Sequence, residues 1–261
     1  MAEVSTCPNG GFRLESLANG WLAGRFAVLK ALGIPHFITT RQGPDVDQIR
    51  GDTAGAARQI TDALDLGETA FLEQVHGPDV LACRAGGLVG AADGLVTSVE
   101  GLALLAKSGD CPIILIADTR CRAVGFAHAS WRATVAGIVP AAVAKMVGLG
   151  CEAGDLIACI CPSAGPECYE VGEEVRAAAI QGIGSYAEAF FQPGPGGRDH
   201  FNLWAANVDA LSRSGVPTQS IHTAGVCTLC RNDLFPSYRR EGERAGRFAA
   251  VIGLPSARIP D

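Results

Sequence analysis

Short hydrophobic runs recur along most of the chain and predict many β-strands. The run at residues 113–117 is continuously apolar, which is typical of a strand covered on both faces. In chain order, the strands that we expect lie at residues 36–41, 70–76, 79–83, 94–97, 102–107, 112–118, 123–128, 156–161, 220–225 and 248–254.

Helical spacing of apolar positions predicts four helices between these strands, at residues 55–66, 131–149, 170–181 and 202–213. Pro140 predicts a kink or a break inside the second helix. Asn202 is a favourable first residue for the fourth helix, and Gly215 is a stop signal after it. The Pro-Gly-Pro-Gly-Gly segment at 193–197 predicts a flexible turn, and it is not a phosphate loop because no Gly-Lys-Ser/Thr follows.

Neither a long linker nor an internal repeat divides the chain, so we expect one α+β domain over residues 1–261, with mixed sheets covered by helices. Residues 1–20 are expected to be a loosely ordered N-terminal extension of that domain. The chain has 261 residues, of which 48% are hydrophobic and 18% are charged. A chain of this length buries roughly 70% of its unfolded surface and needs no disulfides to fold.

Charge and hydropathy exclude several functional classes. The net charge is −6 and the arginines are scattered, so a nucleic-acid-binding surface is not expected. Individual arginines can still bind a small anion. The first ten residues lack the pattern of a signal peptide, and no apolar stretch reaches the ~20 residues of a membrane helix. We therefore expect a cytoplasmic protein.

Three residues at predicted strand ends form a candidate metal site. His76 and His128 each close a strand, and Cys111 precedes a buried one. Two imidazoles and one thiolate suit zinc, and three protein ligands leave the fourth position open for catalysis. The same residues also fit a second chemistry, in which Cys111 is a nucleophile activated by His128.

Other cysteines and arginines offer weaker candidates. Cys227 and Cys230 form a Cys-x-x-Cys pair that suits half a zinc site or a redox pair. Cys159 and Cys161 could supply two further thiolates, although their apolar strand makes core packing the simpler interpretation. Arginine is the natural anion ligand, and those beside predicted turns are Arg41, Arg239 and Arg240.

Eight short motifs, in this order, resemble the laccase-domain family of bacterial and animal proteins, also called polyphenol oxidases and purine nucleoside phosphorylases. The resemblance covers residues 36–254 and rests on an ordered set that is far more specific than any one motif. The motifs are Thr-Thr-Arg at 39–41, Gln-Val-His-Gly at 74–77, Ala-Asp-Gly-Leu-Val-Thr at 92–97, Gly-Asp-Cys-Pro at 109–112, Ala-His-Ala-Ser-Trp-Arg at 127–132, Cys-Tyr-Glu-Val-Gly at 168–172, Cys-Thr at 227–228 and Phe-Pro-Ser-Tyr-Arg-Arg at 235–240.

The resemblance implies an α/β/β/α sandwich and one zinc ion held by His76, Cys111 and His128. The implied reactions are phosphorolysis of adenosine, inosine and methylthioadenosine, together with deamination of adenosine. Purine nucleosides and inorganic phosphate are then the substrates. We expect Arg41 to contact phosphate or substrate, and Gln74, Asp93, Tyr169 and Glu170 to line the substrate site. Asp93, Tyr169 and Glu170 are the candidates for the acid that assists departure of the base.

The chain departs from the family at Ser130, Ala133 and Cys161, where the family usually has glycine, but no proposed ligand is lost. A multicopper oxidase needs a cluster rich in histidine pairs, whereas this chain has five histidines and no His-x-His. Copper bound at the same three ligands, with polyphenol oxidation, is one alternative. Another is a cysteine hydrolase or amidase acting on peptidoglycan precursors through Cys111 and His128. A non-enzymatic partner protein is a third.

Overall fold

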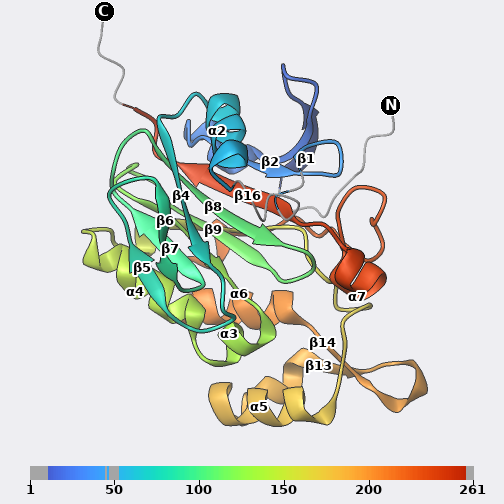
Figure 1. Cartoon of the computed structure of the whole chain (residues 1–261). Coiled ribbons are helices and arrows are strands. Elements are labelled where there is room, and N and C mark those ends of the chain that lie inside the picture. The colour runs from blue at the N-terminus through green and yellow to red at the C-terminus, as the bar shows by residue number, and fades with distance from the viewer. Residues whose placement is uncertain (1–10, 45, 47–52, 257–261) are drawn as a thin grey trace, which may run out of the picture.

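Two large β-sheets form the centre of the protein. The computed structural model describes residues 11–44, 46 and 53–256, and all structural statements below concern these residues (Figure 1). In spatial order, the first sheet contains β1 (Phe12–Ser16), β2 (Leu22–Phe26), β3 (His36–Thr39), β16 (Phe248–Gly253), β8 (Leu102–Ser108), β4 (Glu68–Glu73) and β6 (Gly87–Ala91). The second contains β15 (Ile221–Thr223), β11 (Leu156–Ile160), β9 (Ile113–Asp118), β10 (Val124–His128), β7 (Gly94–Thr97) and β5 (Val80–Ala82).

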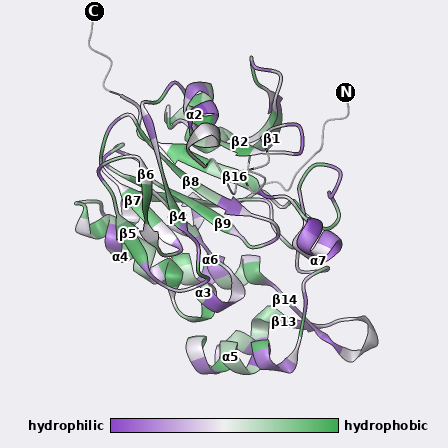
Figure 2. Cartoon of the chain, in the orientation of Figure 1, coloured by the Kyte–Doolittle hydropathy of each residue, from purple (hydrophilic) through white to green (hydrophobic). Residues whose placement is uncertain are grey.

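The two sheets pack face to face. The position of β9 between two cores explains why its sequence is apolar throughout. Ile113 and Leu115 belong to the core between the two sheets, whereas Ile114 and Ile116 belong to the core beneath the helices. Successive side chains of a strand point to opposite faces, so a strand that is buried on both faces needs apolar residues at every position. The predicted central strand is thus confirmed. Figure 2 shows the same hydrophobic character along β8 and β9.

Helices cover the outer faces of both sheets. The α-helices are α1 (Ala27–Ala31), α2 (Thr53–Leu64), α3 (Trp131–Val135), α4 (Ile138–Gly148), α5 (Glu173–Ile183), α6 (Leu203–Arg213) and α7 (Tyr238–Glu241). Short 3-10 helices lie at Ala153–Asp155, Ser185–Phe190, Pro195–Gly197, Thr218–Ser220 and Gly242–Arg244. Ile60 and Leu64 of α2 pack on the first sheet, and Val143 and Met146 of α4 pack on the second. The expected α/β/β/α sandwich is confirmed (Figure 1). No described helix is long and apolar enough to span a bilayer.

A smaller sheet extends the sandwich beside α5. Its strands are β12 (Glu170–Val171), β14 (Asp199–Phe201) and β13 (Phe191–Pro193), in that spatial order. A separate apolar cluster holds this part together and includes Tyr169, Val175 and Phe201. Figure 1 shows β13, β14 and α5 together at one end of the molecule. Tyr169 lies directly before β12, in the connection that joins the second sheet to this extension.

The predicted helix at 131–149 is broken, but three residues before Pro140. Gly137, with a φ of +90°, is the N-cap residue before α4, which places Pro140 in the first turn of that helix, where the missing N–H costs nothing. The predicted helix at 170–181 was wrong at its start. Glu170 and Val171 pair with β14 instead, and α5 begins at Glu173.

The expected loose extension at residues 1–20 was also wrong in its second half. Residues 1–10 lie outside the described part of the chain, but Phe12–Ser16 form β1, which pairs with β2. The Phe12 side chain is 2% exposed and packs against Phe26, with ring centroids 5.0 Å apart. An aromatic anchor at the end of a strand is enough to fix that strand on the edge of the sheet.

Candidate metal centre

The three candidate ligands lie where strands of both sheets end. His76 follows β4, Cys111 lies in the connection from β8 to β9, and His128 is the last residue of β10. Strands β4 and β8 are parallel neighbours, so their carboxyl ends lie at one edge of the first sheet. The connection from β8 to β9 then carries Cys111 across to the second sheet, where β10 pairs with β9 and brings in His128.

The structure brings the three donor atoms together. A ring nitrogen of His76, the sulfur of Cys111 and a ring nitrogen of His128 all lie within 4.8 Å of one another. The two imidazole rings meet edge to face, with their centroids 5.1 Å apart. His128 is buried, Cys111 is half-buried and His76 is exposed, so the cluster has a rigid backing and one side that faces solvent. Two imidazoles and one thiolate in this arrangement fit a zinc ion with a free coordination position.

The loop that carries His76 is fixed by its neighbour Gln74. The Gln74 side-chain amide donates to the carbonyl oxygen of Lys107 at 2.9 Å and accepts from the Lys107 N–H at 2.9 Å. Gln74 thereby continues the pairing of β4 with β8 beyond the strand end. His76 itself has a φ of +64°, a left-handed conformation that is unusual for a residue with a Cβ. Both ends of the Gln74 amide are engaged with the backbone of Lys107. The role of Gln74 as a substrate contact stays a prediction.

Asp93 links the two histidine-bearing segments. One carboxylate oxygen lies 2.7 Å from Nδ1 of His128, and the other accepts the backbone N–H groups of Val75 at 3.0 Å and Gly77 at 2.7 Å. The backbone carbonyl of Asp93 also accepts the N–H of His128 at 2.7 Å. With Nδ1 directed at Asp93, Nε2 is the nitrogen of His128 that remains for a metal.

The charges of the centre support one another. Burial favours the neutral thiol of Cys111, but hydrogen bonds and positive charge from His128 and His76 outweigh it and lower the Cys111 pKa to about 6. Burial would lower the His128 pKa, but Asp93 and Cys111 overcome this and raise it to about 9. The pKa of Asp93 is also lowered, since hydrogen bonds from His128 and Gly77 exceed the effect of burial.

The turn before Cys111 is held by Asp110. Its carboxylate accepts the hydroxyl of Thr228 and the backbone N–H of Arg239, each at 2.6 Å. Asp110 has a φ of +117°, so these two hydrogen bonds stabilise a backbone conformation that is otherwise strained. The Ser108 hydroxyl adds a hydrogen bond to the Cys111 carbonyl at 2.7 Å. Sequence reasoning missed this anchoring role of Asp110, although it quoted both the Gly-Asp-Cys-Pro and the Cys-Thr motifs.

Tyr169 and Arg239 lie beside the cluster. Burial, followed by the negative charge of Cys111, raises the pKa of Tyr169 to about 12, so its hydroxyl stays protonated at neutral pH. The guanidinium carbon of Arg239 lies 4.6 Å from the centre of the Tyr169 ring. One Nη of Arg239 donates to the carbonyl oxygen of Glu170 at 2.6 Å. The Glu170 carboxylate turns toward Arg198, with Nη1 at 2.6 Å.

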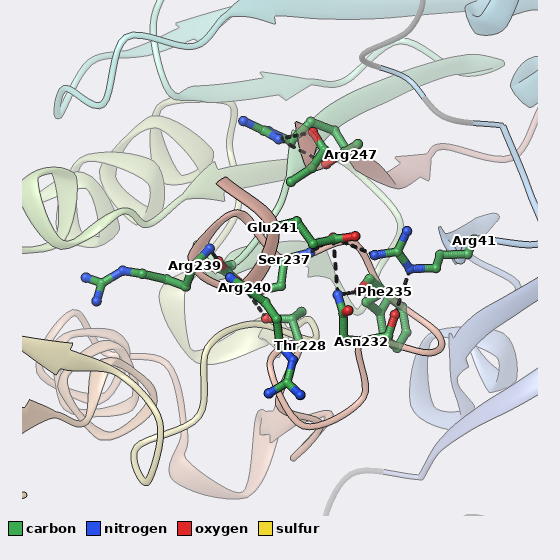
Figure 3. Close-up of polar contacts among 12 residues, drawn as sticks. Arg41, Thr228, Asn232, Phe235, Ser237, Arg239, Arg240, Glu241 and Arg247 are labelled. Atoms are coloured by element: carbon green, nitrogen blue, oxygen red, sulfur yellow. Dashed lines mark hydrogen bonds and ion pairs between the residues drawn. The ribbon is translucent and has the colours of Figure 1, made fainter. Parts of the chain in front are cut away.

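Arg41 lies on another side of α7 and is already paired. Its Nε donates to the carbonyl oxygen of Asn232 at 2.7 Å, and one Nη forms an ion pair with Glu241. Figure 3 shows Arg41 and Arg239 on opposite sides of the segment that carries Ser237 and Glu241. The backbone N–H of Arg239 donates to Asp110, and its guanidinium lies on the Tyr169 ring, so Arg239 is the arginine that contacts the turn before Cys111.

The family departure at Ser130 has a structural role. Its hydroxyl accepts the backbone N–H of Ala133 at 3.2 Å and caps the start of α3. Ser130 is 2% exposed, so the extra hydroxyl is used by the helix that follows His128. Ala133 is fully buried in the core beneath the second sheet.

The interpretation of Cys159 and Cys161 as core residues is confirmed, and the alternative of a four-thiolate site with them is excluded. Cys159 and Cys161 are 0% and 1% exposed and pack in the core between the sheets, far from any role as surface ligands. Cys227 and Cys230 instead meet Cys168, and the three sulfur atoms lie within 4.8 Å of one another. Cys168 was noted only as part of a family motif. Its contact with Cys230 spans 62 positions, so no local pattern indicates it.

A cavity of about 520 Å³ lies apart from the metal centre. Its walls come from β12, α5 and the turn before β14, and its lining residues are Val171, Gly172, Glu173, Arg176, Gly197, Arg198 and Asp199. Arg176 is paired with Asp199 and Arg198 with Glu170, so the guanidinium groups here already have partners.

Known proteins resemble the chain over most of its length. A "Purine nucleoside phosphorylase" of Deinococcus radiodurans is 34% identical over 241 residues, which cover 86% of this chain and 90% of the relative. An "Adenosine deaminase RL5" from an unknown prokaryotic organism is 33% identical over 155 residues, 59% of each chain.

Solved structures have the same fold. The structure of YlmD from Geobacillus stearothermophilus matches with a TM-score of 0.81 and 26% identity, covering 93% of this chain and 99% of that chain. The Bacillus licheniformis hypothetical protein YfiH matches with a TM-score of 0.82 and 24% identity, over 94% and 99% of the two chains. Residues 40–255 match the family model described as multi-copper polyphenol oxidoreductase laccase, and the chain therefore belongs to that family.

Proposed function

We propose that the chain is a zinc-dependent purine nucleoside phosphorylase that also deaminates adenosine. The observation that carries this proposal is the convergence of His76, Cys111 and His128 within 4.8 Å, with one side facing solvent. The names of the relatives from Deinococcus radiodurans and the unknown prokaryote supply the substrate class. Five histidines without a His-x-His pair do not suit the copper cluster that the family description names.

His76, Cys111 and His128 would hold the zinc ion, and Asp93 would orient His128 behind it. A bound zinc ion would supply Lewis-acid polarisation of an oxygen atom, from phosphate in phosphorolysis or from water in deamination. The low pKa of Cys111 favours the thiolate form that a metal ligand requires. Three donor atoms within 4.8 Å and a thiolate at neutral pH thus favour metal binding at this centre.

In phosphorolysis, a phosphate oxygen forms a bond to the anomeric carbon of the ribose while the carbon–nitrogen bond to the purine breaks. The purine leaves with the bonding electrons and takes up a proton. We assign Tyr169 to donate a hydrogen bond during this step, because burial and the charge of Cys111 raise its pKa to about 12 and keep its hydroxyl protonated. Arg239 lies on the Tyr169 ring and offers further N–H donors to phosphate.

Two other acid candidates fit less well. Asp93 is fully buried, both of its carboxylate oxygens are engaged, and its pKa is lowered, so it serves His128 as a carboxylate. The Glu170 carboxylate pairs with Arg198 on the exposed side of β12. Tyr169 therefore remains the group that we propose for assisting departure of the base.

The decisive experiment incubates the purified, zinc-loaded protein with adenosine, inosine or methylthioadenosine and phosphate, and separates the products by chromatography. We expect adenine and ribose 1-phosphate from adenosine when phosphate is present, and inosine from the deaminase reaction without it. Chelation should abolish both reactions, and added zinc should restore them. If fully metal-loaded protein forms neither product, the proposal is wrong.

Two cysteine substitutions, at Cys111 and at Cys121, give a matched comparison. Cys111→Ser should lose one equivalent of zinc and all turnover, because serine is a poor zinc ligand. Cys121 is also half-buried, but it lies outside both cysteine-containing clusters. Cys121→Ser should therefore keep its zinc and its activity, which separates loss of the ligand from a general effect of removing a thiol.

One observation also favours a cysteine hydrolase. Asp93, His128 and Cys111 stand in the order orienting group, base and nucleophile, and the low Cys111 pKa suits a thiolate. His76 discriminates between the two functions, because a cysteine dyad does not need it. His76→Ala should abolish activity in a zinc enzyme and leave much of it in a hydrolase, which would also work after chelation and be inactivated by iodoacetamide.

A further inference from the structure

Three cysteines gather outside the centre just described. Cys168 lies in the connection from β11 to β12, and Cys227 and Cys230 lie in the loop after β15. The sulfur atoms of all three lie within 4.8 Å of one another, and those of Cys168 and Cys230 are 3.4 Å apart. Cys230 is exposed and the other two are half-buried, so the cluster opens to the surface.

Backbone hydrogen bonds hold the two loops together. The Ser163 N–H donates to the carbonyl oxygen of Val226 at 3.2 Å, and the Thr228 N–H donates to that of Ser163 at 3.0 Å. The N–H of Gly165 donates to the sulfur of Cys227 at 3.2 Å. A Cβ on residue 165 would lie 3.0 Å from the Cβ of Cys227, so glycine permits this close approach. The cluster is therefore built on fixed backbone and does not depend on chance contacts of mobile side chains.

The geometry points to a second metal site. A zinc–sulfur bond of ~2.3 Å places tetrahedral sulfur ligands ~3.8 Å apart, which fits three sulfurs that already lie this close. An N–H group that donates to a ligand sulfur, as Gly165 does to Cys227, is the outer support that metal-bound thiolates commonly have. We propose that Cys168, Cys227 and Cys230 bind one thiophilic cation, Zn²⁺ or Cu⁺, separately from the centre at Cys111.

The two clusters share their supporting residues. Cys168 is followed by Tyr169, whose ring lies against the guanidinium of Arg239, and the backbone N–H of Arg239 donates to Asp110. Cys227 is followed by Thr228, whose hydroxyl donates to Asp110, the residue before Cys111. A cation on the three sulfurs thus braces both segments that position the turn of Cys111. The second site is structural in this scheme, and it requires no contact with the substrate.

The test counts metal equivalents in the full chain, kept reduced with a phosphine and first stripped of metal. Competition between the protein and a chromophoric chelator for Zn²⁺ should give two tight equivalents for the wild-type protein. Cys230→Ser should bind one, Cys111→Ser should bind one, and the double variant should bind none. Cys121→Ser is the matched control and should bind two. A parallel titration with Cu⁺ shows which cation the three-sulfur site prefers.

A second readout identifies the residues directly. Iodoacetamide should label Cys168, Cys227 and Cys230 in the metal-free protein and spare them in the metal-loaded protein, as peptide mass spectrometry would show. The proposal fails if Cys230→Ser binds as much Zn²⁺ and Cu⁺ as the wild-type protein, or if the reduced cluster closes into a disulfide in the presence of either cation. If Cys111→Ser retains the wild-type stoichiometry, as Cys121→Ser should, while Cys230→Ser loses one equivalent, the second site stands and the zinc centre proposed for catalysis does not.

Discussion

The carboxylate of Asp93 and the imidazole of His128 form a 2.7 Å hydrogen bond at Nδ1, which leaves Nε2 to face the cluster of His76 and Cys111. The same carboxylate accepts the N–H of Gly77, which follows His76 in the chain. One buried side chain thus fixes two ligands that come from different sheets. A substitution that keeps the shape of Asp93 but removes its charge should therefore weaken metal binding and leave the fold intact.

Asp93→Asn should weaken zinc binding by about 10- to 100-fold, because the uncharged amide no longer stabilises the ligand form of His128. Chelator competition measures the affinity, and thermal unfolding of the metal-free protein checks the fold. Asp79→Asn is the matched control, since Asp79 is an exposed aspartate in the connection between β4 and β5. Equal zinc affinities in the two variants would show that Asp93 does not support the ligand.

Tyr169→Phe removes a hydroxyl whose pKa is raised to about 12. We expect kcat for phosphorolysis to fall by about 10- to 100-fold with little change in KM, since the hydroxyl acts as the base departs. Zinc content should stay at the wild-type level. Tyr186 is exposed and lies in the 3-10 helix Ser185–Phe190, so Tyr186→Phe should behave as the wild-type protein. A Tyr169→Phe enzyme with wild-type kcat would remove Tyr169 from the reaction.

Arg239 and Arg41 should respond differently to substitution. Arg239→Met should raise KM for phosphate by about tenfold or more, because the guanidinium beside Tyr169 is lost. Arg41→Met should leave this KM unchanged and mainly lower stability, since Arg41 pairs with Glu241 and Asn232. Initial rates at varied phosphate, together with denaturant unfolding, measure both effects. The reverse pattern would restore Arg41 as the phosphate ligand expected from the sequence.

His36 should make stability depend on pH. Its ring is fully buried, its Nε2 accepts the N–H of Phe26, and burial lowers its pKa from 6.5 to about 4. The unfolded chain gains a proton near pH 6.5, whereas the folded chain does not until about pH 4. Stability from neutral His36 is thus complete above pH 6.5 and is lost as the pH falls toward 4, by about 3 kcal/mol.

Denaturant unfolding at a series of pH values tests this dependence. In His36→Gln, whose amide offers both an NH2 donor group and a carbonyl acceptor, the free energy of unfolding should fall less between pH 6.5 and pH 4 than in the wild-type protein. Identical slopes in the two proteins would mean that His36 does not titrate as its buried position implies.

The strands that could be predicted were those whose two faces meet different cores. The residues of β9 alternate between the inter-sheet core and the helix-covered core, and their apolar character is visible in the sequence itself. Glu170 shows the opposite case. Its neighbours look helical, yet pairing with His200 across a distance of 30 positions makes it part of β12. A local pattern contains no information about such a partner.

The sequence by itself determined the central strands, the helix start at Asn202, and the choice of His76, Cys111 and His128 as candidate ligands at strand ends. These follow from side-chain periodicity and donor chemistry, which are local properties. Only the tertiary structure decided that Arg239 approaches Tyr169, and that Cys168 rather than Cys159 or Cys161 joins Cys227 and Cys230. Those contacts depend on where distant loops meet after the sheets have packed, because side chains far apart in sequence are brought together by the fold and not by any pattern around them.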